Sequence, residues 1–139
     1  MIYSGTINLK SKGETQIMDI TQDVEKVLLL SNMKKGVLTL FVPGSTGGLT
    51  TIEYESGVVS DLRDAFERIA PRRGSYAHNS RWGDGNGFSH VRASMLGPSM
   101  SIPFSGGRMT LGTWQQIVFI DFDNRPRSRE LIVQIVGEK

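Results

Sequence analysis

Both histidines of the chain lie within thirteen residues, at His78 and His90, on either side of a glycine-rich turn. Imidazole is the side chain that most readily exchanges a proton or binds a metal ion near neutral pH. If the Gly-Asp-Gly-Asn-Gly turn folds back, it brings both rings to one metal ion or one phosphate, with Asp84 or water as a further ligand. The same spacing is compatible with two histidines that each make an ordinary hydrogen bond.

A second group of candidate residues lies in the loop Pro-Gly-Ser-Thr-Gly-Gly, which follows the apolar run 37–42. Backbone N–H groups beside the hydroxyls of Ser45 and Thr46 are suited to bind a phosphate. The loop is not a P-loop, because no Gly-Lys-Ser or Gly-Lys-Thr follows it. A simple hairpin turn explains the same residues equally well.

Two carboxylates are candidates for acid–base chemistry. Glu53 lies among β-branched residues, where a carboxylate that points inward needs a partner. It is therefore a candidate metal ligand or general base, and an outward-facing charge on an edge strand is the alternative. Asp61 is expected in the first turn of a helix, where a carboxylate usually stabilises the helix dipole.

Three arginines alternate with other residues near the end of the chain, at Arg125, Arg127 and Arg129. If this segment is extended, all three side chains point the same way. Guanidinium groups bind phosphate or carboxylate groups through paired hydrogen bonds. The row therefore suits either a phosphorylated ligand or a contact between subunits.

Further candidates follow the second histidine. Arg92 and Ser94 come directly after it in the sequence His-Val-Arg-Ala-Ser, so they can extend the same anion site. Trp114 precedes the most apolar strand of the second half of the chain. Its ring can stack on a planar ligand, although a tryptophan is more often an anchor in a core or an interface.

The composition limits the class of protein. The chain has 139 residues, which fits a single domain spanning 1–139, and its sixteen basic and fourteen acidic side chains leave a net charge of +2, too small for a nucleic-acid-binding surface. No apolar stretch approaches the roughly 20 residues that span a bilayer, and no secretory signal is visible, so we expect a cytoplasmic protein with no membrane partner. Without cysteine, any metal must be held by nitrogen and oxygen.

The spacing of apolar residues predicts the elements that position these side chains. Strands are expected at 1–9, 14–18, 37–42, 49–54, 100–104, 108–111, 116–122 and 131–136, and amphipathic helices at 19–32 and 58–69. The continuous run 37–42 is typical of a strand buried on both faces. Successive strands joined by short turns predict an α+β fold, with mostly antiparallel, β-sandwich-like sheets and two packed helices.

Four segments of the second half form a series of motifs: YAHN at 76–79, SHVRASMLGPSMSIPF at 89–104, LGTWQQIVFIDFD at 111–123 and PRSRELIVQIVGE at 126–138. Together they resemble the YjbQ family, also called the secondary thiamine-phosphate synthase family. The similarity extends upstream through FVPGSTGGLTTIEYESG and covers nearly the whole chain.

The resemblance implies a small α+β domain that assembles as a homotrimer and acts on a small phosphorylated substrate. The implied reaction joins a pyrimidine methyl pyrophosphate to a thiazole phosphate, releases pyrophosphate and forms thiamine phosphate. Such a reaction needs an anion pocket and usually a divalent metal such as zinc or magnesium, but no organic cofactor. A trimeric protein that binds a metal ion or a phosphorylated metabolite without turnover is the alternative.

The family pattern also bears on single residues. Asp61, Arg127 and Arg129 match it, and the two histidines become the expected catalytic and metal-binding groups. Relatives with the same loop carry a third histidine where this chain has Phe88. The resemblance therefore implies that one nitrogen ligand is missing here.

Overall fold

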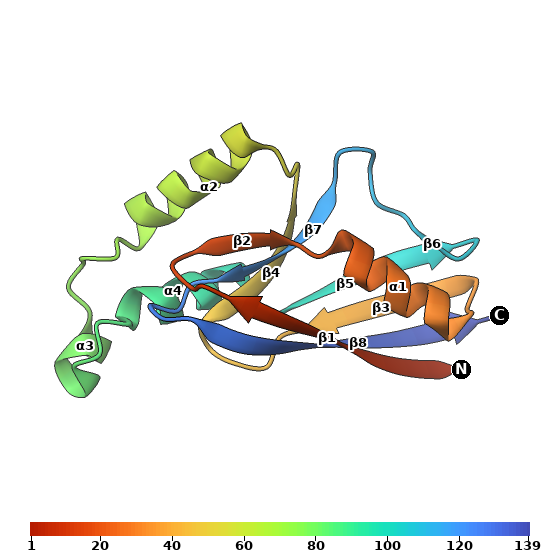
Figure 1. Cartoon of the computed structure of the whole chain (residues 1–139), viewed down its shortest axis with the longest axis horizontal. Helices are drawn as coiled ribbons and strands as arrows, with labels where there is room; N and C mark the ends of the chain where they lie inside the picture. Colours follow the sequence, from red (N-terminus) through yellow and green to blue (C-terminus); the bar gives the residue numbers. More distant parts are fainter.

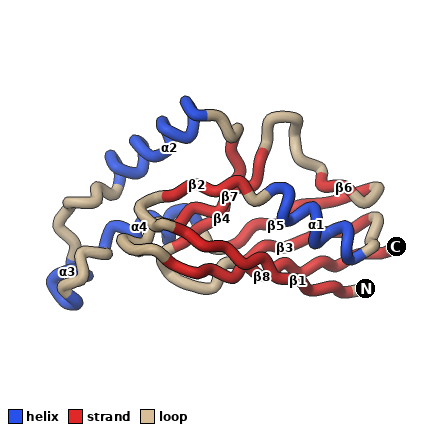
Figure 2. Tube along the Cα trace, in the orientation of Figure 1, coloured by secondary structure: helices blue, strands red, loops and turns tan.

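The computed structural model describes all 139 residues and contains two antiparallel sheets and four helices (Figure 1, Figure 2). The larger sheet has the strand order β1 (Ile2–Ser11), β8 (Arg127–Glu138), β3 (Lys35–Phe41), β5 (Ser99–Ser105) and β6 (Arg108–Met109). The smaller sheet has the order β2 (Gln16–Asp19), β7 (Gln116–Asp121) and β4 (Gly47–Ile52). The helices are α1 (Thr21–Ser31), α2 (Ser56–Ile69), α3 (Ala77–Trp82) and α4 (Gly87–Leu96). The predicted α+β class is confirmed.

β7 lies between the two hydrophobic cores of the domain and contributes side chains to both. It is the central strand of the smaller sheet, and its apolar side chains alternate between two cores. Ile117 and Phe119 face the larger sheet and α1, while Val118 and Ile120 face α2 and α4. Burial on both faces accounts for the unbroken apolar run of this strand.

The larger sheet, in contrast, is covered on one face only. Leu38 and Leu40 of β3 are fully buried, but Val37 and Phe41 are each 43% exposed. The prediction that the run 37–42 is buried on both faces was therefore wrong, because no helix packs on the outer face of β3. Side chains alternate across a strand, so the apolar residues of this run divide between core and surface.

The two longer helices begin where polar side chains hold their first turns. Asp19 Oδ1 accepts hydrogen bonds from the backbone N and Oγ1 of Thr21, at 3.0 and 2.7 Å. The Glu55 carboxylate accepts hydrogen bonds from the backbone N–H groups of Gly57 and Val58, at the start of α2. These contacts satisfy N–H groups that have no partner within the helix.

None of the four helices has the length and apolar character that a membrane-spanning helix needs.

Four helices are present rather than the two predicted, and the additional pair carries the histidines. α3 is a short helix that ends at Gly83, whose φ of 66° lies in the left-handed region. Asn79 Oδ1 accepts a hydrogen bond from the backbone N–H of Gly87, at 2.9 Å, which ties α3 to the first turn of α4. The turn between them therefore joins two helices.

Candidate functional site

α3 and α4 bring the two histidines together. The ring centroids of His78 and His90 are 4.5 Å apart, with an angle of 36° between the ring planes. The expectation that the glycine-rich turn folds back and joins the two rings is confirmed. His78 lies within α3, and His90 lies in the middle of α4, in a part of the chain for which no helix was predicted.

Asn86 fixes the turn between the two helices. Its backbone N–H donates to Asp84 Oδ1, at 3.1 Å. Its own Oδ1 accepts hydrogen bonds from Ser89 Oγ, at 2.6 Å, and from the backbone N–H of Asn124, at 3.1 Å. Since Asn86 is buried and satisfied, the turn is held against the segment that connects β7 to β8.

The histidine pair is partly buried and lacks a full set of hydrogen-bond partners. His78 Nδ1 is buried and makes no hydrogen bond, although Asp84 Oδ1 lies 3.3 Å away. Burial lowers the pKa of His90 below its ordinary value, and the charge of His78 lowers this pKa further, while Asp84 and Asp123 oppose the shift. His90 is therefore uncharged at neutral pH, able to accept a proton.

This shift predicts a pH dependence of stability. Because folding lowers the pKa of His90 from 6.5, the unfolded chain binds more protons in the range just below that value. The free energy of unfolding is expected to rise with pH up to about 6.5 and to gain nothing further from this group above it. Denaturant unfolding across this range should show a smaller slope in His90→Gln; the same slope in both proteins would contradict the prediction.

Beside the histidines lies a network of two buried aspartates and two arginines. Arg129 donates from Nε and Nη2 to the two carboxylate oxygens of Asp121, at 2.8 and 2.9 Å. Thr46 Oγ1 accepts from Arg129 Nη2, at 2.7 Å, and donates to Asp123 Oδ2, at 3.0 Å. Arg127 Nε donates to the same oxygen of Asp123, at 3.1 Å. Two arginines of the expected row, Arg127 and Arg129, are therefore paired with aspartates within the chain, whereas Arg125 is not.

The ionised form of Asp123 is favoured by this network. Burial alone would raise the pKa of its carboxyl group, but hydrogen bonds from Thr46 and Arg127 and the charge of Arg127 lower it overall. The side chain of Asn86 also lowers the pKa of Asp123. The other carboxylate oxygen, Asp123 Oδ1, is buried and has no hydrogen-bond partner. Asn124, next to Asp123, is hydrogen-bonded to Asn86 and to Asp84 of the turn, and the charge of Asp123 acts on His90, so the network lies beside the histidine pair.

The loop between β3 and β4 adds unpaired donors to this site. The backbone N–H groups of Gly44, Ser45 and Thr46 make no hydrogen bond within the chain. At Gly44 the backbone φ is 128°, and a Cβ would lie 3.1 Å from Arg129 Nη1, so glycine lets the guanidinium approach the loop. Arg127 uses only its Nε and is 37% exposed, which leaves its two terminal nitrogens available. Consecutive free N–H groups beside guanidinium nitrogens are a typical anion-binding arrangement.

Arg92 lies on the other side of α4. It donates from Nε to the backbone oxygen of Ala70, from Nη1 to Thr15 Oγ1 and from Nη2 to Glu67, at 2.9, 2.8 and 2.7 Å. All three nitrogens are thus used to fasten α4 to the end of α2 and to the β1–β2 turn. The structure does not place Arg92 beside the histidines, and Ser94 is exposed on α4 without a hydrogen bond from its side chain.

Three further candidates lie apart from the histidine pair in the single chain. Glu53 is exposed and follows the end of β4 that pairs with Gln116, whereas the opposite end pairs with Asp121. Asp61 is exposed in the second turn of α2. Trp114 is 74% exposed in the loop before β7. One chain therefore does not bring these residues to the histidine pair or to the loop at 44–46.

Phe88 has a structural role that the sequence did not reveal. Phe88 is 1% exposed, and its ring lies close to two guanidinium groups. Its ring centroid is 5.3 Å from Arg72 Cζ and 5.0 Å from Arg92 Cζ. Residues two apart on a helix point to nearly opposite sides, so position 88 faces away from His90. The interpretation that Phe88 stands in place of a third ligand for the pair is not supported by this geometry.

The residues at the histidine pair do not fit a metal centre. No group of three or more His, Asp or Glu side chains is arranged to hold a metal ion. The nearest carboxylate to the pair, Asp84, directs Oδ1 towards the buried Nδ1 of His78. The chemistry proposed below therefore uses only side chains and backbone groups of this chain.

An α+β domain in which a histidine pair lies beside a loop of free backbone N–H groups is thus the class of protein that the fold and site define. The chain belongs to the UPF0047 family of YjbQ-like proteins, whose model matches residues 5–138. It is 36% identical over 137 residues to a UPF0047 protein of Methanothermobacter thermautotrophicus, covering 99% of this chain and 94% of that one. It is 31% identical over 134 residues to the UPF0047 protein YugU of Bacillus subtilis, covering 95% and 98%.

Solved structures agree with this membership. The hypothetical protein APE1520 of Aeropyrum pernix superposes with a TM-score of 0.91 and 30% identity, over 98% of this chain and 99% of that one. A YbjQ-like protein of unknown function from Sulfolobus solfataricus superposes with a TM-score of 0.89 and 27% identity, over 99% and 100%. The two-sheet architecture is therefore a property of the family.

Proposed function

We propose that this chain is a transferase of the thiamine-phosphate synthase type, which joins a pyrimidine methyl pyrophosphate to a thiazole phosphate and releases pyrophosphate. The observation that carries the proposal is the loop of free N–H groups at 44–46, whose Thr46 donates a hydrogen bond to Asp123 in the network beside the histidine pair. A phosphorylated substrate also fits the cytoplasmic location expected from the sequence.

The chemistry of the transfer explains why such a loop is useful. The carbon–oxygen bond between the pyrimidine methylene group and pyrophosphate breaks, and the electron pair leaves with the pyrophosphate. A carbon–nitrogen bond to the thiazole ring then forms at the same methylene group. Negative charge therefore grows on the bridging oxygen of the leaving group. Donors that are already oriented towards this position stabilise it without reorganisation.

In this proposal the loop at 44–46 and the free nitrogens of Arg127 hold the pyrophosphate. His90 is uncharged before the substrate binds, because burial lowers its pKa. An anion close to the ring favours the protonated form, so binding raises this pKa again. One ring of the pair can then donate a proton to the leaving oxygen as it departs.

A phosphorylated-metabolite-binding protein without turnover is the second candidate, and one observation favours it. Glu53 follows β4 and Asp61 lies on α2, and both are exposed and away from the histidines. The carboxylates near the pair are Asp84 and Asp123, and Thr46 and Arg127 already bond Asp123. A site that binds phosphate through N–H groups and arginines needs no general base. Both candidates bind phosphate at the loop 44–46, the anion loop, and they differ only in whether a reaction follows.

The test measures binding and turnover separately. Wild-type protein and Arg127→Gln are titrated with pyrophosphate by calorimetry, and thiamine phosphate formation is assayed from the two substrates. The transferase proposal expects turnover in the wild type and at least tenfold weaker pyrophosphate binding in the variant. Binding without turnover would favour the second candidate, and no binding in either protein would exclude both. Arg125→Gln is the matched control, because Arg125 is exposed and takes part in none of the ion pairs of the chain.

We also propose that the homotrimer implied by the family forms through the outer face of the larger sheet. Exposed apolar side chains pair across β3 and β8 on this face, Val37 with Val136 and Phe41 with Ile132. Light scattering should give three times the chain mass of 15.4 kDa. Ile132→Lys should reduce the mass to that of one chain, since a charge at a packed apolar contact is costly. An unchanged trimer would place the interface elsewhere.

A further inference from the structure

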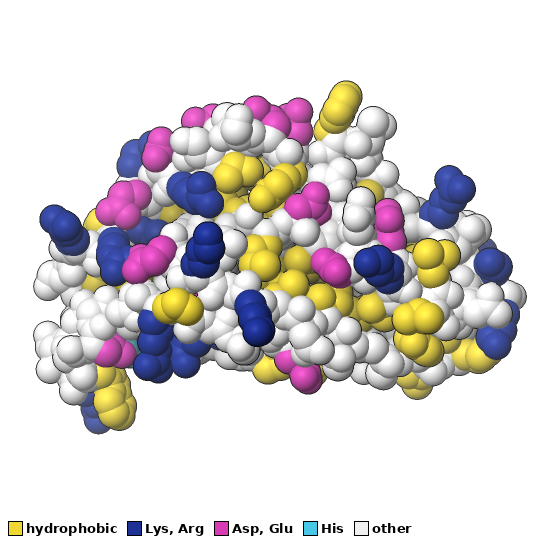
Figure 3. Space-filling model, viewed as in Figure 1, with side chains coloured by type: hydrophobic (Ala, Val, Ile, Leu, Met, Phe, Trp, Pro, Cys, Tyr) yellow, Lys and Arg dark blue, Asp and Glu magenta, His cyan; other side chains and the backbone are white.

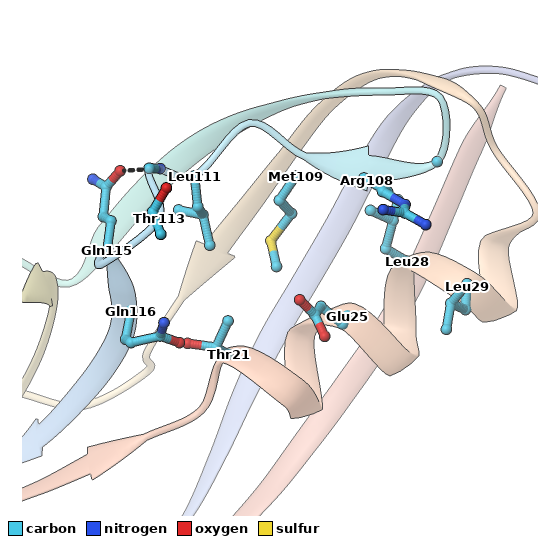
Figure 4. Close-up of a pocket in the computed structure, with 12 residues that line it drawn as sticks. Thr21, Glu25, Leu28, Leu29, Arg108, Met109, Leu111, Thr113, Gln115 and Gln116 are labelled. Atoms are coloured by element: carbon cyan, nitrogen blue, oxygen red, sulfur yellow. Dashed lines mark hydrogen bonds between the residues drawn. The ribbon is translucent and has the colours of Figure 1, made fainter. Parts of the chain in front are cut away.

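A cavity far from the histidine pair lies between α1 and the β6–β7 connection. Its volume is about 520 Å³, within the range of small-molecule sites. Figure 4 shows residues of α1 on one side of this groove and residues of β6 and the following loop on the other. The groove is at the Gln116 end of β7, whereas Asp121 at the other end belongs to the anion site.

The floor of the groove is apolar. Leu28 of α1 is 2% exposed, and Met109 and Leu111 cover it from the opposite side as half-buried residues. Since Leu28 is already buried, the half-buried Met109 and Leu111 above it supply the apolar surface that a branched aliphatic group can contact. A ligand that covers it gains the usual contribution of removing apolar surface from water.

Two opposite charges line the same groove without pairing to anything. Glu25 projects from α1 and Arg108 from β6, and both side chains are directed into the space between the two elements (Figure 4). Neither takes part in any of the six ion pairs of the chain. The chain therefore presents a free carboxylate and a free guanidinium above one apolar floor.

The wall that carries Leu111 is held in place before any ligand binds. Gln115 Oε1 accepts a hydrogen bond from the backbone N–H of Gly112, at 3.1 Å, and its Nε2 donates to Thr51 Oγ1 of β4, at 3.0 Å. On the other wall, Thr21 Oγ1 accepts from the backbone N–H of Ile117, at 2.9 Å. Both walls are thus fastened to the smaller sheet, and a preformed site loses less entropy on binding.

We infer that this groove binds a zwitterionic small molecule with an aliphatic body, of the amino-acid class. In this arrangement Arg108 pairs with the ligand carboxylate, Glu25 pairs with the ligand ammonium group, and the aliphatic side chain lies on Leu28, Met109 and Leu111. A ligand that lacks one charge leaves one of the two protein groups without its partner. The site is separate from the anion loop, so it does not depend on the transferase proposal.

NMR titration of the 15N-labelled protein with four probes tests the inference: L-leucine, N-acetyl-L-leucine, L-leucinamide and the dipeptide leucyl-leucine. L-leucine is expected to cause saturable shifts at the amides of Gly107, Leu111 and Gly112. N-acetyl-L-leucine lacks the cation and leucinamide lacks the anion, so each is expected to bind at least tenfold more weakly. Tighter binding of the dipeptide would assign the site to a peptide rather than to a free amino acid.

Two variants make the test specific to the charges. In Glu25→Gln the affinity for L-leucine should fall to that for N-acetyl-L-leucine, and in Arg108→Gln it should fall to that for leucinamide. Both residues are exposed, so neither variant is expected to unfold the protein. Lys26→Gln, exposed on α1 outside the groove, is the control and should bind as the wild type does. Absence of saturable shifts, or equal affinity for leucine and its singly charged analogues, would overturn the inference.

Discussion

Replacement of Arg129 by alanine is expected to lower the free energy of unfolding by about 3–5 kcal/mol. Asp121 is fully buried, and Arg129 holds both of its carboxylate oxygens. Without the guanidinium, the ionised carboxylate stays in a site that water does not reach, and Thr46 also loses a donor. Urea or guanidinium unfolding of the wild type and the variant measures the difference.

A control and a second variant separate the ion pair from other effects. Arg125→Ala removes an exposed arginine of the same segment and should change stability by less than about 0.5 kcal/mol. The double variant Arg129→Ala with Asp121→Asn removes the buried charge as well, so it should be more stable than Arg129→Ala alone. If Arg129→Ala unfolds at the same denaturant concentration as Arg125→Ala, the buried pair does not contribute to stability as described.

The second large effect concerns catalysis. If the chain is a transferase, His90→Gln is expected to reduce kcat/KM for thiamine phosphate formation by about 10²–10⁴-fold, the usual contribution of a general acid or base. Glutamine keeps a polar side chain of similar size, so the unfolding transition should change little. Asp64→Asn, an exposed change on α2, is the control and should keep full activity. Equal activity of all three proteins would exclude His90 as the proton donor.

Glu53→Gln shows whether one chain holds the whole site. Glu53 is exposed and lies beyond the end of β4 that is remote from Asp121, so we expect activity close to that of the wild type. A loss comparable to that of His90→Gln would mean that a second copy brings Glu53 to the histidines. This outcome would also explain why the family pattern includes residues that the single chain keeps apart.

Much of the fold could be predicted because its elements have regular apolar periods. The strands and the helices α1 and α2 lie close to their predicted ranges. α3 and α4 were missed for a physical reason: no side chain caps either helix, and α4 buries residues of every type, from Phe88 to Arg92. Without a capping residue or a single apolar face, a short helix leaves little periodic signal.

The candidate site could be predicted only in part. Proximity of the two histidines follows from the glycine-rich turn between them, but the aspartates of the network were missed. Their signal is present in the sequence, since Asp121 and Asp123 interrupt the apolar strand Ile-Val-Phe-Ile-Asp-Phe-Asp. Carboxylates in such a strand are buried and need cations, which Arg127 and Arg129 supply at the same alternating spacing. The directions in which Arg92 and Phe88 point could not be predicted, because they depend on α4 being a helix and the sequence did not indicate this helix.

The position of β8 within the larger sheet has a consequence for how the protein is made. β8 lies between β1 and β3, and it pairs with β1 along its length, from Ile2 opposite Val136 to Ser11 opposite Arg127. During synthesis β1 therefore gains its neighbour in the sheet only after β8 has also been made. Contacts between such distant parts of a chain form slowly. Until β8 has been made, β1 and β3 both expose unpaired edges, the form in which a nascent sheet is most open to aggregation and to chaperones.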